Sequence, residues 1–286
     1  MLTVIFDGIA SGMLLFLISV GLSVTLGVMG FVNLAHGAFA MLGGYVCVLL
    51  LNQAQLPFLA AVPLATVVAG LAGIVLERTL YRRLYGSAHL DQVLFSIGLL
   101  LMAIGAAHFF FGDQQQPVVL PHFLHGQINL PGLDIGIYRL FLVMTGLAIA
   151  AGLELLVRRT PFGARLRAAV DNATAARGVG IDVGRVFTLA FALGSALAGL
   201  GGALGIEVLG LDPGFPLKYI AYFLIVVAVG GSGSIKGSLF AAIILGIADV
   251  AGKYYVPQAG AFAIYAVMIA MLIVRPEGLF GRRLAR

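Results

Sequence analysis

The chain has 286 residues, of which 61% are hydrophobic and only 10% are charged, and its mean hydropathy is +1.07. A water-soluble domain carries about 25% charged residues, so this composition excludes a soluble globule and predicts a polytopic membrane protein. The net charge of +5 would suggest nucleic-acid binding in a soluble chain, but in a membrane protein it reflects basic loops on the cytoplasmic side. The single cysteine, Cys47, excludes an intramolecular disulfide.

Apolar runs follow one another along the chain, and a spanning helix needs about 20 such residues. No Lys or Arg precedes Arg78, so we expect the first run to be a retained span rather than a cleaved signal peptide. The runs 9–50 and 217–252 are too long for one span, and glycines interrupt both, so each should form two short or broken segments. Single spans are predicted at 57–80, 90–111, 137–157, 186–207 and 259–274. The expected fold is an all-α transmembrane bundle of eight or nine spans, forming one domain over 1–286.

Basic residues are distributed unevenly between the loops. Fourteen of the 17 Lys and Arg residues lie in 78–83, 158–185, 236 and the tail 275–286. The loop 112–136 contains none, and the turn 207–216 holds Glu207 and Asp212 without a base. The positive-inside rule therefore places the basic loops and the C-terminus in the cytoplasm, and 112–136 in the periplasm. With nine spans, the N-terminus lies outside.

The two interrupted runs share a spacing at an offset of 200 residues, since Gly30 and Gly37 correspond to Gly230 and Gly237. Glycine-interrupted segments in corresponding halves are typical of broken helices at a transport pathway. Asn33 and His36 are polar groups at membrane depth, and they either hydrogen-bond a neighbouring helix to hold the break or line a water-filled path. The predicted pathway residues are Asn33, His36, Gly37, Gly230, Gly233 and Gly237.

Other polar side chains have simpler interpretations. Glu77 and Glu154 lie beside Arg78 and near Arg158, which predicts ion pairing at the membrane interface. Asp249 and His108, like Asn33, either hydrogen-bond a neighbouring helix or line a water-filled path, and both are expected near the membrane interface. The spacing of His122 and His125 resembles that of metal ligands, but one such pair in a Pro-rich loop favours solvated side chains, so no metal site is predicted.

The segment GGSGSIKGS at 230–238 invites comparison with phosphate-binding loops. A P-loop requires Gly-Lys-Ser/Thr in that order, whereas Lys236 precedes Gly237 here. The dinucleotide pattern fails as well, because Lys236 stands where the third glycine is required. The sequence therefore predicts no nucleotide site, no cofactor and no catalytic residues of its own.

The loop 158–185 is the one strongly polar stretch, with six Arg residues. Thr160-Pro161 can open a short helix, and Asp171 or Asn172 can cap a second one over 173–177. Two short helices at the membrane surface suit insertion into a groove on a soluble partner, the alternative being a loop that only anchors to anionic lipid.

Four segments carry a family resemblance: GLSVTLGVMGFVNLAHGAFAMLGGY (21–45), RTPFGARLRAAVDNATAARGVGID (159–182), VAVGGSGSIKGSLFAAIILGI (227–247) and RPEGLFGRR (275–283). Through them the chain resembles, over essentially its whole length, the permease subunits of bacterial branched-chain amino acid ABC importers, in particular the shorter of the two permeases. The resemblance implies an inner-membrane subunit that forms half of a translocation pathway for branched-chain amino acids or related amides and carboxylates.

The resemblance also implies partners: a second homologous permease, two ATPase subunits and a periplasmic binding protein. It makes the 158–185 loop the coupling loop that docks on an ATPase. The expected coupling residues are Phe162, Arg165, Arg167, Asp171, Asn172 and Arg177. The alternative functions are a passive channel and a stand-alone secondary transporter, for which Asp249 is the best intramembrane candidate.

Overall fold

The computed structural model describes residues 1–281 except 31, 119 and 132. Within this part, six helices are long and apolar enough to cross a membrane: α1 (Leu2–Met29), α3 (Phe58–Thr79), α4 (His89–Phe111), α5 (Ile137–Arg159), α8 (Val183–Leu209) and α10 (Ile235–Tyr255). Three apolar helices are shorter: α2 (His36–Asn52), α9 (Phe215–Gly230) and α11 (Ala263–Val274). The predicted all-α polytopic bundle is confirmed, and both long interrupted runs are divided into two helices.

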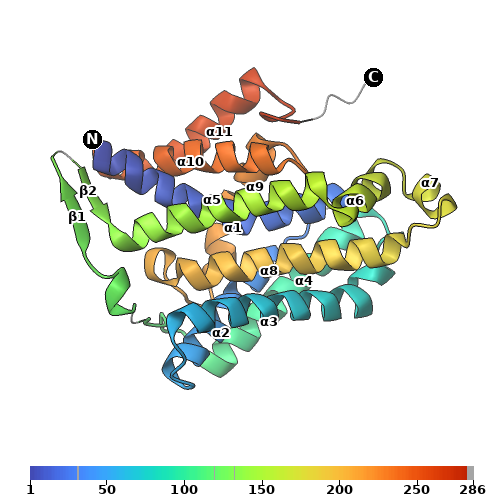
Figure 1. Ribbon diagram of the computed structural model, residues 1–286, viewed down its shortest axis with the longest axis horizontal. Helices are drawn as coiled ribbons and strands as arrows, with labels where there is room; N and C mark the ends of the chain where they lie inside the picture. The colour runs from blue at the N-terminus through green and yellow to red at the C-terminus, as the bar shows by residue number, and fades with distance from the viewer. Residues whose placement is uncertain (31, 119, 132, 282–286) are drawn as a thin grey trace.

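The long helices lie side by side along one direction, and the hairpin and the short helices α6 and α7 lie at opposite ends of the bundle (Figure 1). One end carries the hairpin of β1 (Gln127–Leu130) and β2 (Leu133–Gly136), and we call it the hairpin end. The opposite end carries α6 (Pro161–Asp171) and α7 (Ala173–Gly178). Three short 3₁₀ helices complete the described structure: η1 (Tyr81–Arg83), η2 (His122–Leu124) and η3 (Gly260–Phe262).

The α6 end also gathers the other basic loops, so we call it the basic end. Lys236, at the start of α10, lies 3.6 Å from a carboxylate oxygen of Glu154 near the end of α5. A side chain at Gly184, where α8 begins, would meet the guanidinium of Arg82 in η1. Charge asymmetry in the sequence therefore corresponds to the two opposite ends of the structure.

Helices α1 and α8 form the centre of the bundle. Their most apolar segments are 83% and 72% buried, against 17% for α4 and 22% for α5. The two helices are antiparallel, and added side chains at Gly21 and Gly194 would each collide with the other helix's backbone or side chains. Glycine pairs of this kind let helix backbones touch, which is how membrane helices pack without a hydrophobic driving force.

Helices α2 and α9 begin inside the bundle rather than at its ends. α1 ends at Gly30 (φ 74°) and α8 ends at Gly210 (φ 73°), both in the left-handed region that glycine favours. After each glycine the chain turns back inward, and a side chain at Gly37 in α2 would contact Pro216 in α9. With 17 and 16 residues, the two helices are about 25 Å long, less than the roughly 30 Å core.

The breaks correspond at a different offset from the one that the sequence suggested. Gly30 and Gly210, each at the end of a central helix and before a short one, are equivalent in position, at an offset of 180 residues. The predicted partner segment, 230–237, instead connects α9 to α10, and the carbonyl of Gly230 lies against Gly237 there. Several tight helix contacts in this bundle require glycine, so equal glycine spacing alone does not pair two breaks.

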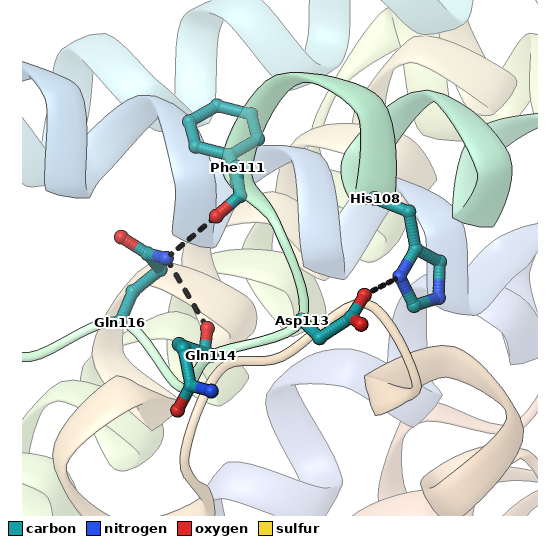
Figure 2. A network of polar contacts seen from close by, with 5 residues as sticks. All are labelled: His108, Phe111, Asp113, Gln114 and Gln116. Carbon is teal, nitrogen blue, oxygen red and sulfur yellow. Dashed lines mark hydrogen bonds and ion pairs between the residues drawn. The ribbon is translucent and has the colours of Figure 1, made fainter.

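The loop 112–136 begins with contacts to the end of α4, shown in Figure 2. His108 pairs with Asp113, and the Gln116 amide donates to the carbonyls of Phe111 (3.4 Å) and Gln114 (3.2 Å). His108 is about half exposed, as expected for a residue near the interface. The hairpin that follows pairs Gln127 with Gly136 and is antiparallel.

The remaining histidines of this loop form no larger cluster. The rings of His122 and His125 are 6.0 Å apart, and His125 bonds the carbonyl of Leu120. Over the residues that the structure describes, no group of three or more His, Cys, Asp or Glu residues could hold a metal ion.

The segment after α11 folds back on the α9–α10 connection. The amide of Leu279 donates to the carbonyl of Val229 (2.7 Å), and Phe280 stacks on Phe240. Residues 275–281 of the RPEGLFGRR motif therefore pack on the glycine-rich connection, while Arg282 and Arg283 fall outside the described residues.

Candidate coupling site

Two short helices and their caps form the core of the 158–185 loop. The Thr160 hydroxyl accepts from the amide of Gly163 (3.2 Å) at the start of α6, and Pro161 occupies the first turn. Asn172 ends α6 and caps α7 by accepting from the amide of Ala175 (2.9 Å). Asp182 caps α8 in the same way, because its carboxylate accepts from the amide of Arg185 (3.0 Å). Each such cap is worth about 1 kcal/mol, so the sequence fixes all three helix starts locally.

The two short helices rest on the ends of the central helices. Leu166 and Ala169 of α6 and Ala176 of α7 form a separate apolar cluster with Val24 of α1 and Val186 of α8. This cluster is distinct from the main core of the bundle. α6 therefore packs on both central helices, and α7 packs on α8.

The six predicted coupling residues divide into two groups. Arg165, Asp171, Asn172 and Arg177 are exposed on the outer surface of the two helices. Phe162 is half-buried against the small apolar cluster, and the exposed Arg167 donates to the backbone carbonyl of Val157. A role in docking stays a prediction for all six, although Phe162, Arg167, Asp171 and Asn172 also make contacts within their own chain.

Gly163 is a residue of this site that sequence reasoning did not single out. A side chain there would collide with the backbone carbonyls of Leu156 and Val157 at the end of α5. The absence of a side chain therefore allows α6 to fold tightly against α5. Its only signal in the sequence is a glycine within the first turn of a capped helix, where glycine is otherwise unfavourable.

A cavity of about 570 Å³ opens beside α7, between η1 and the start of α8. Its lining combines the cations Arg82 and Arg177 with Asp182 and the rings of Tyr85 and Phe187. Arg82 comes from a loop nearly 100 residues away, so sequence spacing gave no reason to group it with Arg177.

The predicted interfacial ion pair between Glu77 and Arg78 is wrong. Its side chain is fully buried, and its two carboxylate oxygens accept from the hydroxyls of Tyr85 (2.7 Å) and Thr188 (2.6 Å), while Arg78 points to the exposed surface. Burial, and then the bond to Glu77, raises the pKa of Tyr85, which therefore stays protonated as a donor. Glu77 thus joins α3 to the first turns of α8. Glu154 does pair with Arg158, as expected.

Asn33 and His36 are both buried, at 2% exposure, around the break before α2. Asn33 Oδ1 accepts from the hydroxyl of Tyr81 (2.8 Å), and His36 Nε2 donates to the carbonyl of Ile18 (2.9 Å). These are the contacts of the first alternative, in which the side chains hold the break. A role in the pathway stays a prediction.

The predicted glycines lie at close contacts between backbones. Gly37 abuts α9, Gly233 lies against Gly27 of α1, and Gly230 lies against Gly237. None of the six predicted pathway residues lines the cavity beside α7 or the two cavities toward the hairpin end.

Residues 4–274 match the family described as branched-chain amino acid transport system / permease component. The permease protein BraD of a high-affinity branched-chain amino acid transport system in Pseudomonas aeruginosa is 26% identical, covering 96% of this chain and 94% of BraD. The corresponding LivH of Escherichia coli K12 is 28% identical, covering 97% of this chain and 94% of LivH. LivM of the same organism is 25% identical, covering 93% of this chain but 68% of LivM. The chain therefore belongs to the family of permease components of branched-chain amino acid transport systems.

Proposed function

We propose that this chain is the permease subunit of an ABC importer in the bacterial inner membrane, and that α6 and α7 dock on an ATPase subunit. The chain forms half of a translocation pathway for branched-chain amino acids or closely related small molecules. A second homologous permease forms the other half, and a periplasmic binding protein delivers the substrate. ATP is hydrolysed by the partner subunits.

The observation that carries the proposal is the construction of the basic end. Two capped helices present Arg165 and Arg177 on the exposed surface of this end, while their inner faces contact the central helices α1 and α8. Charge-assisted hydrogen bonds from arginine to carboxylates are strong and directional, which suits docking on a moving partner. Closure of the ATPases would thus displace the two most buried helices of the permease.

The orientation follows from the same asymmetry. With the basic end in the cytoplasm, the hairpin end and the N-terminus face the periplasm, where the binding protein docks. The C-terminus is then cytoplasmic, since residues 275–281 pack on the α9–α10 connection near the basic end. The breaks around 30–37 and 230–237 would shape the pathway where this chain meets the second permease.

Charge reversal tests the docking surface without unfolding it. In the complete importer reconstituted in proteoliposomes, the double variant Arg165→Glu/Arg177→Glu should lose ATP hydrolysis stimulated by loaded binding protein. Arg83→Glu is the matched control, because Arg83 is an exposed arginine of the same end outside α6 and α7. Stimulated hydrolysis that survives in the double variant at the level of the control would refute ATPase docking at this surface.

A further inference from the structure

A second polar cavity, of about 410 Å³, lies toward the hairpin end of the bundle, away from the coupling site. It is lined by residues of α1, α5, α9 and α10, with the end of α8 beside it. Along α1 the cavity extends from Asp7 to Leu15, which is about 12 Å at the helical rise of about 1.5 Å per residue. Of the residues singled out in the sequence, Asp249 lines it.

Two ion pairs line the cavity and bring its total charge to zero. Asp7 of α1 pairs with Arg139 of α5, and Asp249 pairs with Lys253 one turn later in α10 (2.6 Å). Asp249 also accepts from the hydroxyl of Tyr222 in α9 (3.3 Å). Asp7 and Asp249 are mostly buried, whereas Arg139 and Lys253 are about half exposed. Buried charges within a membrane bundle are costly, and they usually mark a substrate or ion path.

One carboxylate oxygen of these charged residues is left without a donor. The second carboxylate oxygen of Asp7, Oδ1, is buried and has no hydrogen-bond partner in the described part of the chain. An unsatisfied buried acceptor carries a desolvation cost, which a bound donor group would remove. Asp249, by contrast, has a donor on each of its oxygens.

The rest of the cavity wall is apolar or aromatic. Leu15, Leu142 and Val250 form one part of the lining, and the rings of Tyr219 and Tyr222 form another. Mainly apolar walls with a few convergent polar groups are typical of small-molecule sites. The cavity can therefore receive an aliphatic group beside its charges.

We infer that this cavity binds an amino acid zwitterion with an aliphatic side chain. The α-ammonium group donates to the free oxygen of Asp7, and the α-carboxylate accepts from Lys253 or Arg139. The side chain lies against the apolar wall. A ligand of zero net charge preserves the neutrality of the cavity, whereas a cation or an anion would leave one charge uncompensated. This inference rests on the proposed transport function and assigns a binding site to it.

A neighbouring cavity gives the site a route to the hairpin end. This outer cavity, of about 600 Å³, extends along the hairpin and shares Asp7, Arg139 and Val208 with the inner one. The Asp7–Arg139 pair thus lies on the boundary between the two cavities. The site would be loaded from the side on which the binding protein docks.

Direct binding of L-leucine tests the inference. The full chain, purified with its partner subunits into nanodiscs without binding protein, should bind radiolabelled L-leucine saturably. Leucinamide, a cation, and 4-methylpentanoate, an anion, should compete about tenfold less well, the ratio for one lost charge-assisted hydrogen bond. Asp7→Asn and Lys253→Gln should weaken leucine binding by a similar factor.

The matched control is Lys218→Gln, which breaks the exposed Asp212–Lys218 pair outside the inner cavity. It should leave leucine binding unchanged. No saturable binding to the wild-type complex, equal binding by the Asp7 and Lys253 variants, or equal competition by the two charged analogues would each overturn the inference. The analogue comparison uses only the wild type, so it remains valid if a variant folds poorly. These outcomes are independent of coupling, which the arginine variants of α6 and α7 report separately.

Discussion

Glu77 illustrates how partners in space decide the role of a polar residue in this chain. Its sequence neighbour, Arg78, suggested an ion pair at the membrane surface, yet the carboxylate is buried and receives two hydroxyl groups. One hydroxyl comes from Thr188, more than 100 positions away. The sequence could indicate that Glu77 is costly to bury, but not which distant groups compensate it.

Truncating Glu77 should therefore destabilise the protein. Glu77→Ala leaves the hydroxyl of Tyr85 without an acceptor, at a cost on the order of 1–3 kcal/mol, while Thr188 can still donate to the carbonyl of Gly184. The thermal unfolding temperature of the purified protein in detergent should fall, and Glu77→Gln, which keeps one acceptor oxygen, should lower it less. Glu207→Ala serves as control because that carboxylate is exposed. Equal unfolding temperatures for Glu77→Ala and the control would contradict this account.

Gly163 gives a second test at a single residue. Gly163→Ala places a methyl group against the carbonyls at the end of α5, so α6 must shift from its position. We expect membrane insertion to be retained and stimulated ATP hydrolysis to fall at least severalfold. Gly178→Ala, in the same loop but with open space around it, should leave hydrolysis unchanged. The measurement is phosphate release in proteoliposomes, and equal rates for both variants would disprove the tight α5–α6 contact.

Among the helices, hydropathy located the spans well but placed the breaks less well. The length of the apolar runs predicted the long helices, because a helix that crosses lipid must satisfy its own backbone hydrogen bonds. The short helices α2 and α9 begin inside the bundle at positions set by their contact with each other, between Gly37 and Pro216. Such a contact depends on tertiary structure, so glycine spacing alone selected 230–237 rather than 210–216 as the counterpart of the first break.

In the candidate site too, the sequence predicted local features but not those that depend on tertiary contacts. Caps at Thr160 and Asn172 are local, and the sequence predicted both short helices from them. Arg82 and Gly163 belong to the site through contacts with distant or neighbouring helices that no local pattern encodes.

The contact between α8 and α2 should be intolerant of any side chain. Gly202→Ala directs a methyl group at the backbone of Ala40, and overpacking of this kind costs typically 1–3 kcal/mol. Gly105→Ala in α4 is the matched control, since nothing lies within 4 Å of that position. The first variant should lower the unfolding temperature, and the second should leave it unchanged or raise it through better helix propensity. A stable Gly202→Ala protein would contradict the close α2–α8 packing.

Across the whole molecule, the two ends differ in charge and construction, and this difference predicts opposite sides of the membrane. In a Cys47→Ala background, a cysteine at Val179, which is 79% exposed in the loop after α7, should be labelled by an impermeant maleimide only from the cytoplasm. A cysteine at Gln127 in the hairpin should be labelled only from the periplasm. Intact cells compared with inverted vesicles make the measurement. Labelling of both sites from one side would reject the orientation.

The meeting of α2 and α9 at Gly37 and Pro216 has an electrostatic consequence. Each helix carries roughly half a positive elementary charge at its N-terminus, and here two such ends face each other deep inside the bundle. An inorganic cation that entered this region would be repelled from both directions, while a molecule without net charge would meet little opposition. We therefore expect the subunit to resist proton and sodium leakage, so that import does not dissipate the membrane potential.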